Sequence, residues 1–531
     1  MKTGDVQIRV HPNGRRLQTK KGSVLMASLL DRNIFLRSDC GGKGRCGKCR
    51  VKVAAPDDDA FRYENACEFR VDKDIEIEIP ETSLLSSHII TKAPAELPGT
   101  FRQKFLNAKG EDSYGIAVDL GTTTIAVYLC NTARGEAVAS LAVKNPQVLY
   151  GDDVMNRIGA VGQAFENLEK MQRLVVRAIE WGIKELCRSN ALEPEIVEKM
   201  TVVGNPAMIH IFAGVDPSSI GVSPYQPAFY DAERFQASDL GFKQMDFPVQ
   251  VLSQVSGFIG GDILAAAMAS DLEHMPDGTL LIDLGTNGEL ILKAGGRLFA
   301  TSCATGPAFE GATLSCGMQA VPGAVNRVRI EEGRDFPAVT RIQSAGGPKA
   351  KPSGICGTGV ISAVAQFCKN NIIGPGGAFI TGSGRVALAK EASGSMRYDI
   401  VPDTPVKNGS AVFISQKDIR SVQLGKAALM TGIEFLLKRA GLKEPDTLII
   451  AGAFGTYMDK TDMMTIGMIP RLNPDRVRAV GNAAGAGAVM VLCDETCLDL
   501  SSRMANELEV IELACDPGFQ NRFIENLGFP I

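Results

Sequence analysis

Residues 115–129 read GIAVDLGTTTIAVYL, and residues 278–292 read GTLLIDLGTNGELIL. In each stretch an apolar strand ends in Asp-Leu-Gly-Thr, turns through small polar residues and continues as a second apolar strand. The two aspartates, Asp119 and Asp283, lie 164 residues apart. A single hairpin of this kind could be an ordinary tight turn, but two of them indicate a duplicated unit. The sequence therefore predicts a body of two related α/β lobes.

Turns of this composition are suited to phosphate binding. Glycine, threonine and asparagine bring backbone N–H groups and side-chain donors to the surface of a turn, where they can hold phosphate oxygens. An aspartate at the end of a strand can position Mg²⁺, usually through water, because that ion prefers carboxylate and phosphate oxygens. We therefore expect Asp119 and Asp283 to organise Mg²⁺ and the phosphates of ATP. The expected phosphate contacts are Gly121, Thr122, Thr123, Thr124, Gly285, Thr286, Asn287 and Gly288.

Two further glycine-rich stretches fit a nucleotide site. SGICGTGVISAVAQF at 353–367 runs from a glycine loop into a predicted helix, whose N-terminus would carry partial positive charge. LIIAGAFGTYMD at 448–459 runs from a buried strand into a turn that is small enough for an adenosine to lie against the backbone. The expected contacts in the two stretches are Gly357, Thr358, Gly359, Gly452, Ala453, Phe454 and Gly455.

Asp262 is a third candidate acid. The stretch SGFIGGDILAA at 256–266 places it at the start of a helix, where a carboxylate could orient Mg²⁺ or an attacking water. An acid that is favoured there only by the helix dipole explains the same position equally well.

The order of these motifs resembles a known superfamily. The sequence has neither the GxxxxGK[ST] pattern of P-loop NTPases nor the H-R-D and D-F-G pair of protein kinases. Two such hairpins, a connecting helix, a late AGAFG turn and a closing helix GNAAGAGAVMVL resemble the acetate and sugar kinases, heat-shock chaperones and actin. The resemblance spans residues 114–492. It implies an actin-like ATPase whose two lobes are RNase H-like duplicates.

Four cysteines near the N-terminus have the spacing of an iron–sulfur site. CGGKGRCGKC at 40–49 and a fourth cysteine in YENACEF give C-x5-C-x2-C-x17-C. Four thiolates ligate both irons of a [2Fe-2S] cluster, and intervening glycines let backbone N–H groups turn towards the sulfurs. The plant-type pattern has four residues between its first two cysteines, so five is a variant. The expected ligands are Cys40, Cys46, Cys49 and Cys67.

Zinc is the alternative metal, because C-x2-C pairs also ligate zinc, but such sites typically need two pairs and this region has one.

The pattern of strands and a helix around the cysteines favours a ferredoxin. Val6, Ile8 and Val10 alternate with polar residues as in a strand, and IEIEIP at 75–80 reads as another. SVLMASLLDRN at 23–33 has helical spacing behind Ser23 as a plausible N-cap. The sequence therefore predicts a small α+β domain of the β-grasp type.

Composition narrows the partners and the compartment. A formal net charge of -4 gives no basic field for nucleic acid or an anionic membrane. Neither a secretory leader nor an apolar run of about 18 residues is evident, so we expect a cytoplasmic protein. The 13 cysteines are an odd number, which is a poor start for a disulfide framework.

A chain of 531 residues exceeds the size of a single core, so several domains are expected. Residues 81–112 have mixed polarity and two prolines, which is typical of a linker; a mobile tether and a well-packed connection fit equally well. The predicted parts are a ferredoxin domain at 1–80, the linker at 81–112, ATPase lobe I at 113–276, and lobe II at 277–531 with the adenosine turn and a C-terminal helix.

A [2Fe-2S] domain fused to an actin-like ATPase resembles one family, the ATP-dependent reductive activators of corrinoid proteins. Further stretches that carry the resemblance are KNPQVLYGDDVMNRI at 144–158, GNPAMIHIFAG at 204–214, ATGPAFEGA at 304–312 and the terminal IELACDPGFQNRFIENLGFP. The resemblance implies that ATP is used to return one electron, through the cluster, to a corrinoid oxidised from Co(I) to inactive Co(II). It also implies a corrinoid protein of a methyltransferase system, an upstream low-potential reductant and a homodimer.

One departure from the family and two other functions stay open. There is little room between the cluster domain and the first hairpin for the middle domain that the best-known activators carry. The protein could instead donate electrons to another low-potential enzyme, as activators of 2-hydroxyacyl-CoA dehydratases do, or sense redox state through nucleotide-dependent binding. Cys303, Cys316 and Cys356 lie near glycine loops and could suggest a cluster of the dehydratase-activator kind. They lack a shared ligand spacing, so we expect them to be structural.

Overall fold

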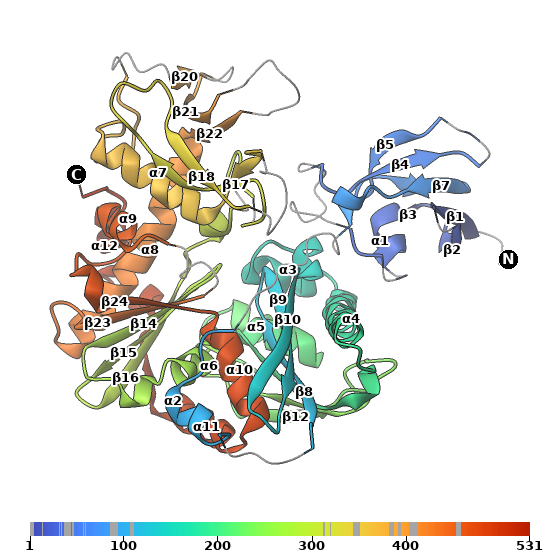
Figure 1. Ribbon diagram of the computed structural model, residues 1–531, viewed down its shortest axis with the longest axis horizontal. Helices are drawn as coiled ribbons and strands as arrows, with labels where there is room; N and C mark the ends of the chain where they lie inside the picture. The colour runs from blue at the N-terminus through green and yellow to red at the C-terminus, as the bar shows by residue number, and fades with distance from the viewer. Residues whose placement is uncertain are drawn as a thin grey trace. The chain divides into compact units, whose positions relative to one another are not determined.

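The computed structural model describes residues 5–12, 14–30, 32, 34–36, 44, 47–56, 58, 60–84, 94–106, 111–311, 314–318, 320–343, 351–381, 387–390, 394–402, 411–452 and 458–530. The chain forms two compact units (Figure 1). The first unit contains Met1–Lys92, Gly110–Phe229 and Glu233–Val251. The second contains Ala93–Lys109, Tyr230–Ala232 and Leu252–Ile531.

The N-terminal domain of the first unit is the predicted β-grasp. Its five-stranded sheet has the order β2-β1-β7-β4-β5, with β1 antiparallel to β2 and parallel to β7. The short helix α1 (Leu25–Leu30) packs on the sheet through Leu25 and Leu29, both fully buried. The strands are β1 (Asp5–His11), β2 (Arg15–Lys20), β4 (Arg50–Ala54), β5 (Arg62–Asn65) and β7 (Ile75–Glu78), with β3 (Ser23–Val24) and β6 (Arg70–Val71) paired beside them.

Ser23 does not cap this helix. It lies in β3, where it pairs with Val71, and the helix begins only at Leu25. The predicted helix is confirmed from Leu25 onward. Ser23 is not part of it, because Ser23 pairs with a strand almost fifty residues away.

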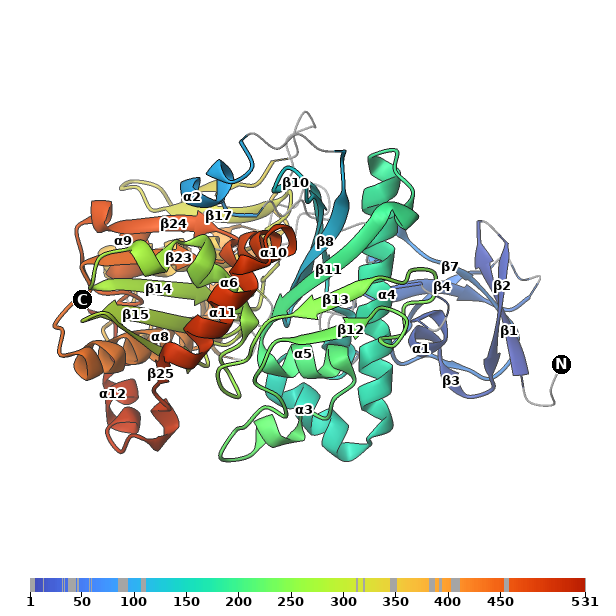
Figure 2. The same cartoon turned by 90° about the horizontal axis from the view of Figure 1, so that it is seen from below.

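The rest of the first unit is a six-stranded sheet of order β10-β9-β8-β11-β13-β12. Strands β8, β9 and β10 form an antiparallel meander, whereas β8, β11 and β13 are parallel (Figure 2). The strands are β8 (Tyr114–Leu120), β9 (Thr124–Asn131), β10 (Glu136–Lys144), β11 (Val197–Gly204), β12 (Glu233–Gln236) and β13 (Pro248–Val251), and the helices are α3 (Val154–Gln163), α4 (Glu166–Ser189) and α5 (Pro206–Ala213).

Five strands of the main sheet of the second unit repeat this topology, and the sixth, β25, lies beside β16 at the edge opposite to that of β12. The order of that sheet is β24-β23-β14-β15-β16-β25, with β14, β15 and β16 antiparallel and β14, β23 and β24 parallel. The central strands β8 and β14 carry Asp119 and Asp283, so the predicted duplication is confirmed. The strands are β14 (Thr279–Leu284), β15 (Gly288–Ala294), β16 (Arg297–Cys303), β23 (Thr447–Ala451), β24 (Val477–Gly481) and β25 (Leu508–Val510).

Helices and two small sheets complete the second unit. The core is continuous from β14 to α7 and α8 and includes Leu290, Phe309 and Phe367. The helices are α2 (Gly99–Gln103), α6 (Gly261–Ala269), α7 (Gly357–Lys369), α8 (Gln416–Ala440), α9 (Lys460–Thr465), α10 (Ala483–Cys493), α11 (Thr496–Glu507) and α12 (Phe519–Asn526). The small sheets are β17 (Ala324–Arg329), β18 (Ala338–Arg341) and β19 (Gly354–Ile355), and β20 (Leu388–Lys390), β21 (Met396–Val401) and β22 (Val412–Ser415).

Helix α6 belongs to the second unit, whose longest segment is Leu252–Ile531. The reason is the packing of α6 on α10: an added Cβ at Gly487 would lie only 2.1 Å from the Ala265 carbonyl oxygen. Two helices in such close contact belong to one unit.

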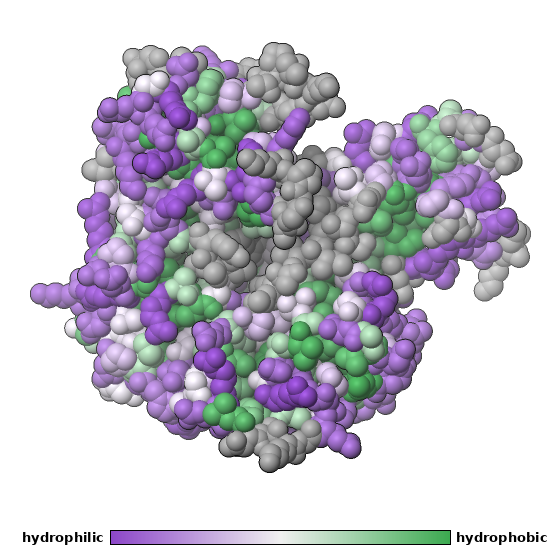
Figure 3. Space-filling view, in the orientation of Figure 1, coloured by the Kyte–Doolittle hydropathy of each residue, from purple (hydrophilic) through white to green (hydrophobic). Residues whose placement is uncertain are grey.

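On the face shown in Figure 3, the described residues are mostly hydrophilic, with apolar residues in separate patches. Among the helices that the structure describes, none combines the length and apolar character needed to cross a bilayer.

Candidate functional site

The first hairpin turn, residues 121–124, joins β8 to β9. Asp119 is 7% exposed and lies directly opposite Ala126 in the strand register. The turn is closed by the Gly121 N–H, which donates to the Thr124 carbonyl at 3.1 Å. A Cβ at position 121 would lie 2.7 Å from that same oxygen. The turn therefore requires glycine at this position.

The other carbonyl oxygens of this turn accept hydrogen bonds from buried groups of the protein. Asn145 Nδ2 donates to the Gly121 carbonyl at 3.0 Å, and the Asn145 backbone N–H donates to the Thr123 carbonyl at 2.8 Å. Arg157 Nη2 donates to the Thr122 carbonyl at 2.6 Å. Both Asn145 and Arg157 are fully buried. Because its acceptors are committed to the protein, the turn presents no carbonyl oxygen to an anion.

Asn205 orients the Thr122 hydroxyl. Asn205 Oδ1 accepts the Met208 backbone N–H at 3.0 Å and so caps α5. Its Nδ2 donates to Thr122 Oγ1 at 3.0 Å. Since the hydroxyl oxygen already accepts, the hydroxyl hydrogen is the group that Thr122 can offer to a phosphate.

The second turn, residues 285–287, is built in the same way from different side chains. The Gly285 N–H donates to the Asn287 carbonyl at 2.8 Å. The hydroxyl of Thr305, 2% exposed, lies 3.0 Å from the Thr286 carbonyl oxygen and 3.3 Å from that of Gly285. Thr305 thus does for the second turn what Asn145 and Arg157 do for the first.

These supporting side chains were not predicted. Asn145, Arg157, Asn205 and Thr305 lie in stretches that carry the family resemblance, but nothing in their local pattern indicated a contact with either turn. The signal that could have found them is their type. They are buried polar residues, and such residues need hydrogen-bond partners.

Gly452 lies against the second hairpin. Strand β23 runs parallel to β14 with Ala451 opposite Asp283, so the next residue reaches the end of the Asp283 strand. Gly452 has a φ of +95°, and a Cβ there would lie 2.5 Å from the Leu284 carbonyl and 3.1 Å from Asp283 Oδ1. The structure therefore brings the start of the predicted adenosine turn next to Asp283. Ala453, Phe454 and Gly455 lie outside the described residues.

Glu289 is an acid that the sequence reasoning missed. It stands opposite Asp283 in the β14–β15 register, and the two side chains therefore lie on one face of the sheet. Burial, together with the neighbouring Asp262 and Asp283 carboxylates, raises the pKa of Glu289 well above its ordinary value. Asp262, Asp283 and Glu289 therefore lie close enough for their charges to interact. In the first hairpin the position that corresponds to Glu289 is Ala126.

The glycines at the start of α7 have a packing explanation. A Cβ at Gly357 would lie 1.6 Å from the Phe309 carbonyl, and one at Gly359 would lie 2.2 Å from the Val325 carbonyl. Thr358 is buried, and its hydroxyl lies 3.2 Å from the Cys356 sulfur. The close approach of α7 to β17 accounts for both glycines without a ligand.

Cys49 and Cys67 lie together at one end of the β4–β5 pair. Arg50 pairs with Asn65, which brings the flanking cysteines to the same edge, and their sulfurs are 3.3 Å apart. Gly47 has a φ of +62°, a conformation that favours glycine in the cysteine loop. Two thiolates this close could share one iron. Cys40 and Cys46 lie outside the described residues.

The later cysteines do not gather at one site. Cys303 is buried against β15, and burial raises its pKa well above the ordinary value. Cys316 lies beside the Phe413 backbone, and Cys356 lies beside the Val325 carbonyl. Within the described ranges no group of three or more His, Cys, Asp or Glu side chains is arranged to hold a metal ion directly. A structural role for these three cysteines accords with these surroundings.

Comparison with known proteins accounts for nearly the whole chain. Residues 8–72 match the family of 2Fe-2S iron–sulfur cluster binding domains. Residues 114–275 match the RACo middle region, and residues 277–531 match the C-terminal domain of RACo, the ASKHA domain.

Two curated relatives and one solved structure agree. The chain is 31% identical to the corrinoid activation enzyme RamQ of Eubacterium limosum, over 80% of this chain and 71% of the relative. It is 25% identical to the [Co(II) methylated amine-specific corrinoid protein] reductase of Methanosarcina barkeri, over 78% and 77%. A solved reductive activator for a corrinoid, iron–sulfur protein matches with a TM-score of 0.73 and 25% identity, over 99% of this chain and 98% of that one.

Fold and comparisons together define an iron–sulfur protein with a nucleotide-binding body of the acetate and sugar kinase, chaperone and actin type. The chain belongs to the family of RACo-like corrinoid-activating enzymes.

The expectation that a middle domain is missing is wrong. The RACo middle region matches residues 114–275, which are the residues assigned above to the first ATPase lobe. The prediction looked for the middle domain between the cluster domain and the first hairpin, whereas the middle region begins with that hairpin.

Proposed function

We propose that this protein reductively activates a corrinoid protein of a methyltransferase system. It accepts an electron from a low-potential reductant, holds it on the [2Fe-2S] cluster and passes it to inactive Co(II), which becomes Co(I), at the expense of ATP. The observation that carries this proposal is the pair of turns whose carbonyl oxygens face hydrogen-bond donors of the protein itself, in a chain that also carries the cluster domain.

The energetics explain why a nucleotide site and a cluster occur in one chain. Each 59 mV of uphill one-electron transfer costs about 1.4 kcal/mol. Reduction of a low-potential cobalt centre by an ordinary ferredoxin must therefore be coupled to a second process. Nucleotide binding shifts an equilibrium between two states only by its differential affinity for them. The ATP-bound state is accordingly the one that favours transfer to the corrinoid.

The acids of the site fit Mg²⁺, which would neutralise phosphate charge when bound. The donor set is carboxylate, which this ion prefers, and the buried Glu289 lies beside Asp283 and Asp262. In the second unit, Asp283 would hold the ion through water and Asp262 would orient the attacking water. Asp119 would be the corresponding acid of the first unit. Gly452 would flank the adenosine, with Ala453, Phe454 and Gly455 following it.

The remaining assignments follow the family. The protein would act in the cytoplasm as a homodimer, with Cys40, Cys46, Cys49 and Cys67 as cluster ligands. The turns Gly121 to Thr124 and Gly285 to Gly288 would contact phosphate oxygens, through donors other than the Gly121 and Gly285 N–H groups, which close the turns.

The test is a spectroscopic assay of Co(II) loss from a corrinoid protein, with reductant, in the presence and absence of MgATP. Wild type should reduce Co(II) only with ATP. Asp283→Ala should lower the ATP-dependent rate by about two orders of magnitude and leave the visible spectrum of the cluster unchanged. Asp277→Ala, at the other end of the same hairpin, is the matched control and should retain the rate.

Two results would contradict the proposal. One is a Co(II) reduction rate that is the same with and without ATP across candidate corrinoid proteins. The other is loss of the cluster spectrum in Asp283→Ala, which would mean that the aspartate supports the cluster domain and not the nucleotide step.

A further inference from the structure

The described part of the linker, residues 94–106, is seated on the second unit and is called the strap below. Pro94 forms a parallel bridge with Asn482, and the Ala95 N–H donates to the Asn482 carbonyl at 3.0 Å. Helix α2 follows, with Phe101 only 3% exposed. Lys104 then pairs with Asp494, an interaction that raises the pKa of Lys104. The strap is therefore bound at its start, its middle and its end.

The first of these anchors lies next to the candidate nucleotide site. Asn482 follows Gly481, whose carbonyl accepts the Gly452 N–H at 2.9 Å. Gly452 in turn lies against the Leu284 carbonyl and Asp283 Oδ1, so closely that a Cβ would not fit. An unbroken series of backbone contacts thus runs from the strap to the end of the Asp283 strand.

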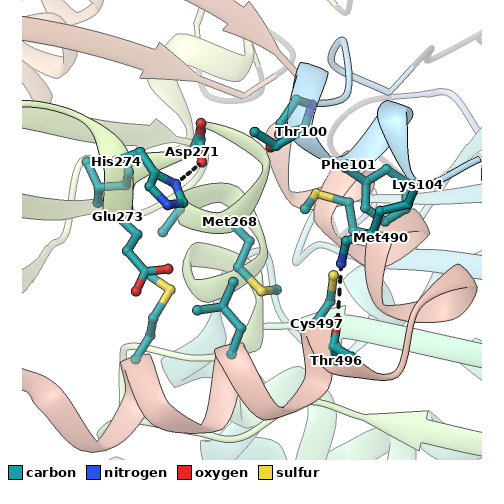
Figure 4. Close-up of a pocket in the computed structure, with 15 residues that line it drawn as sticks. Thr100, Phe101, Lys104, Met268, Asp271, Glu273, His274, Met490, Thr496 and Cys497 are labelled. Carbon is teal, nitrogen blue, oxygen red and sulfur yellow. Dashed lines mark hydrogen bonds and ion pairs between the residues drawn. The ribbon is translucent and has the colours of Figure 1, made fainter.

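The last two anchors lie over a cavity. Its volume is about 200 Å³, and Figure 4 shows Phe101 and Lys104 of the strap on one side of it, with the Lys104 ammonium group directed at Thr496. Met268 of α6 and Met490 of α10 also line it. Methionine side chains repack readily, so the space beneath the strap gives it room to shift.

Helices α6 and α10 connect this cavity to the same site. Helix α6 carries Asp262 in its first turn and Met268 near its end. Helix α10 begins directly after Asn482 and carries Met490 near its end. Because α6 and α10 are in van der Waals contact along Gly487 and Ala265, a shift at their N-termini reaches the cavity as a rigid movement.

We propose that the strap is the element through which nucleotide binding in the second unit reaches the iron–sulfur domain and gates electron transfer. Along the chain, residues 85–93 connect the strap to that domain. Its seat on Asn482 differs between the nucleotide-free and nucleotide-bound states, and this difference supplies the coupling free energy. The inference rests on the proposed nucleotide site.

The first measurement is hydrogen–deuterium exchange of the full-length protein with and without a non-hydrolysable ATP analogue. Nucleotide binding is followed separately by the shift in thermal unfolding. The amides of 94–106, and that of Ala95 in particular, should change their exchange rate by about threefold or more when the analogue binds.

The second measurement uses Lys104→Met, which removes the ion pair with Asp494 but touches no residue of the nucleotide site. The variant should bind the analogue as wild type does, while the stimulation of Co(II) reduction by ATP falls by about fivefold or more. The matched control is Lys170→Met, which removes an exposed Lys–Glu pair from α4. Phe101→Ala provides a second release of the strap and should reproduce the effect.

The outcomes separate the two proposals. If the analogue binds and exchange of 94–106 does not change, the strap is not the coupling element and the proposed function stands. If Lys104→Met loses no more stimulation than Lys170→Met, the strap proposal fails in the same way. If the analogue gives no thermal shift at all, the nucleotide site itself is wrong and both proposals fall.

Discussion

A single hydroxyl group, that of Thr305, supports the carbonyl oxygens of the second turn. Thr305→Val keeps the shape of the side chain but removes the one hydroxyl hydrogen that can donate to the Thr286 carbonyl or to the Gly285 carbonyl. Buried acceptors left without a donor cost about 1–3 kcal/mol, and the freed carbonyls would repel an anion. We expect a loss of unfolding free energy of that size and, in addition, weaker binding of ATP measured by calorimetry.

The control for this prediction is Thr279→Val on β14, the strand that leads into the second turn. The Thr279 hydroxyl is also fully buried and donates to a carbonyl, that of Pro276 at 2.7 Å, but at the opposite end of β14 from the turn. It should cost similar stability and leave ATP affinity unchanged. Equal affinities in the two variants would show that Thr305 serves folding alone.

Lys426 gives a pH dependence. Its Nζ donates to the Gly528 carbonyl and lies 5.2 Å from the centre of the Phe529 ring. Burial lowers the pKa of Lys426 to about 8, from an ordinary value of 10.5. The folded chain therefore binds fewer protons than the unfolded chain between these values, and this residue makes the free energy of unfolding rise with pH there.

Urea denaturation from pH 7 to pH 10.5 measures this contribution. The difference in unfolding free energy between wild type and Lys426→Met should increase in favour of wild type as the pH rises through about 8. A difference that is constant over the whole range would mean that the amine keeps its ordinary pKa in the folded protein.

At the scale of elements, the contact between α6 and α10 depends on one glycine. Because a Cβ at Gly487 would lie 2.1 Å from the Ala265 carbonyl, Gly487→Ala must push the two helices apart. Overpacking of this kind typically costs about 1–3 kcal/mol. The measurement is the midpoint of urea denaturation, and the midpoint should fall.

Gly159→Ala in α3 is the comparison, because a Cβ there meets nothing within 4 Å. Alanine is the better helix former by about 1 kcal/mol, so this variant should be as stable as wild type or more so. If both glycines respond alike, helix propensity and not the close contact explains Gly487.

The elements that the sequence predicted best are those with a local pattern. Asp119 and Asp283 end strands whose apolar runs and turn residues are contiguous, and the structure places both in antiparallel hairpins. The β-grasp strands were equally legible from their alternation.

Elements that depend on distant partners were not predictable in this way. Ser23 has the side chain of an N-cap, but Val71 draws it into a strand. Thr305 and Asn145 have no periodic signal, since their partners are backbone atoms of turns about twenty residues earlier in the chain. Glu289 was not predicted, because only the strand register shows that it lies opposite Asp283.

At the scale of the whole molecule, the two lobes share one topology but not one chemistry. Each has a central strand that ends in aspartate, flanked by a meander on one side and parallel strands on the other. The first turn is supported by an arginine and an asparagine, and the second by a threonine with extra acids nearby. The two lobes thus share a duplicated arrangement of strands, and they differ at the turns where a ligand would bind.

The seat of the strap also changes the length of the tether that carries the redox centre. The linker read from sequence spans residues 81–112, but Leu84 still belongs to the cluster domain and Pro94 is already bound to the second unit. Ten peptide steps remain between them, a contour of at most about 35 Å. The cluster domain is also attached within the first unit, where it packs on α4 and Arg177 Nη1 donates to the Leu30 carbonyl at 3.2 Å. A separate, freely diffusing ferredoxin has neither attachment, so it would need a far higher concentration to deliver electrons at the same rate.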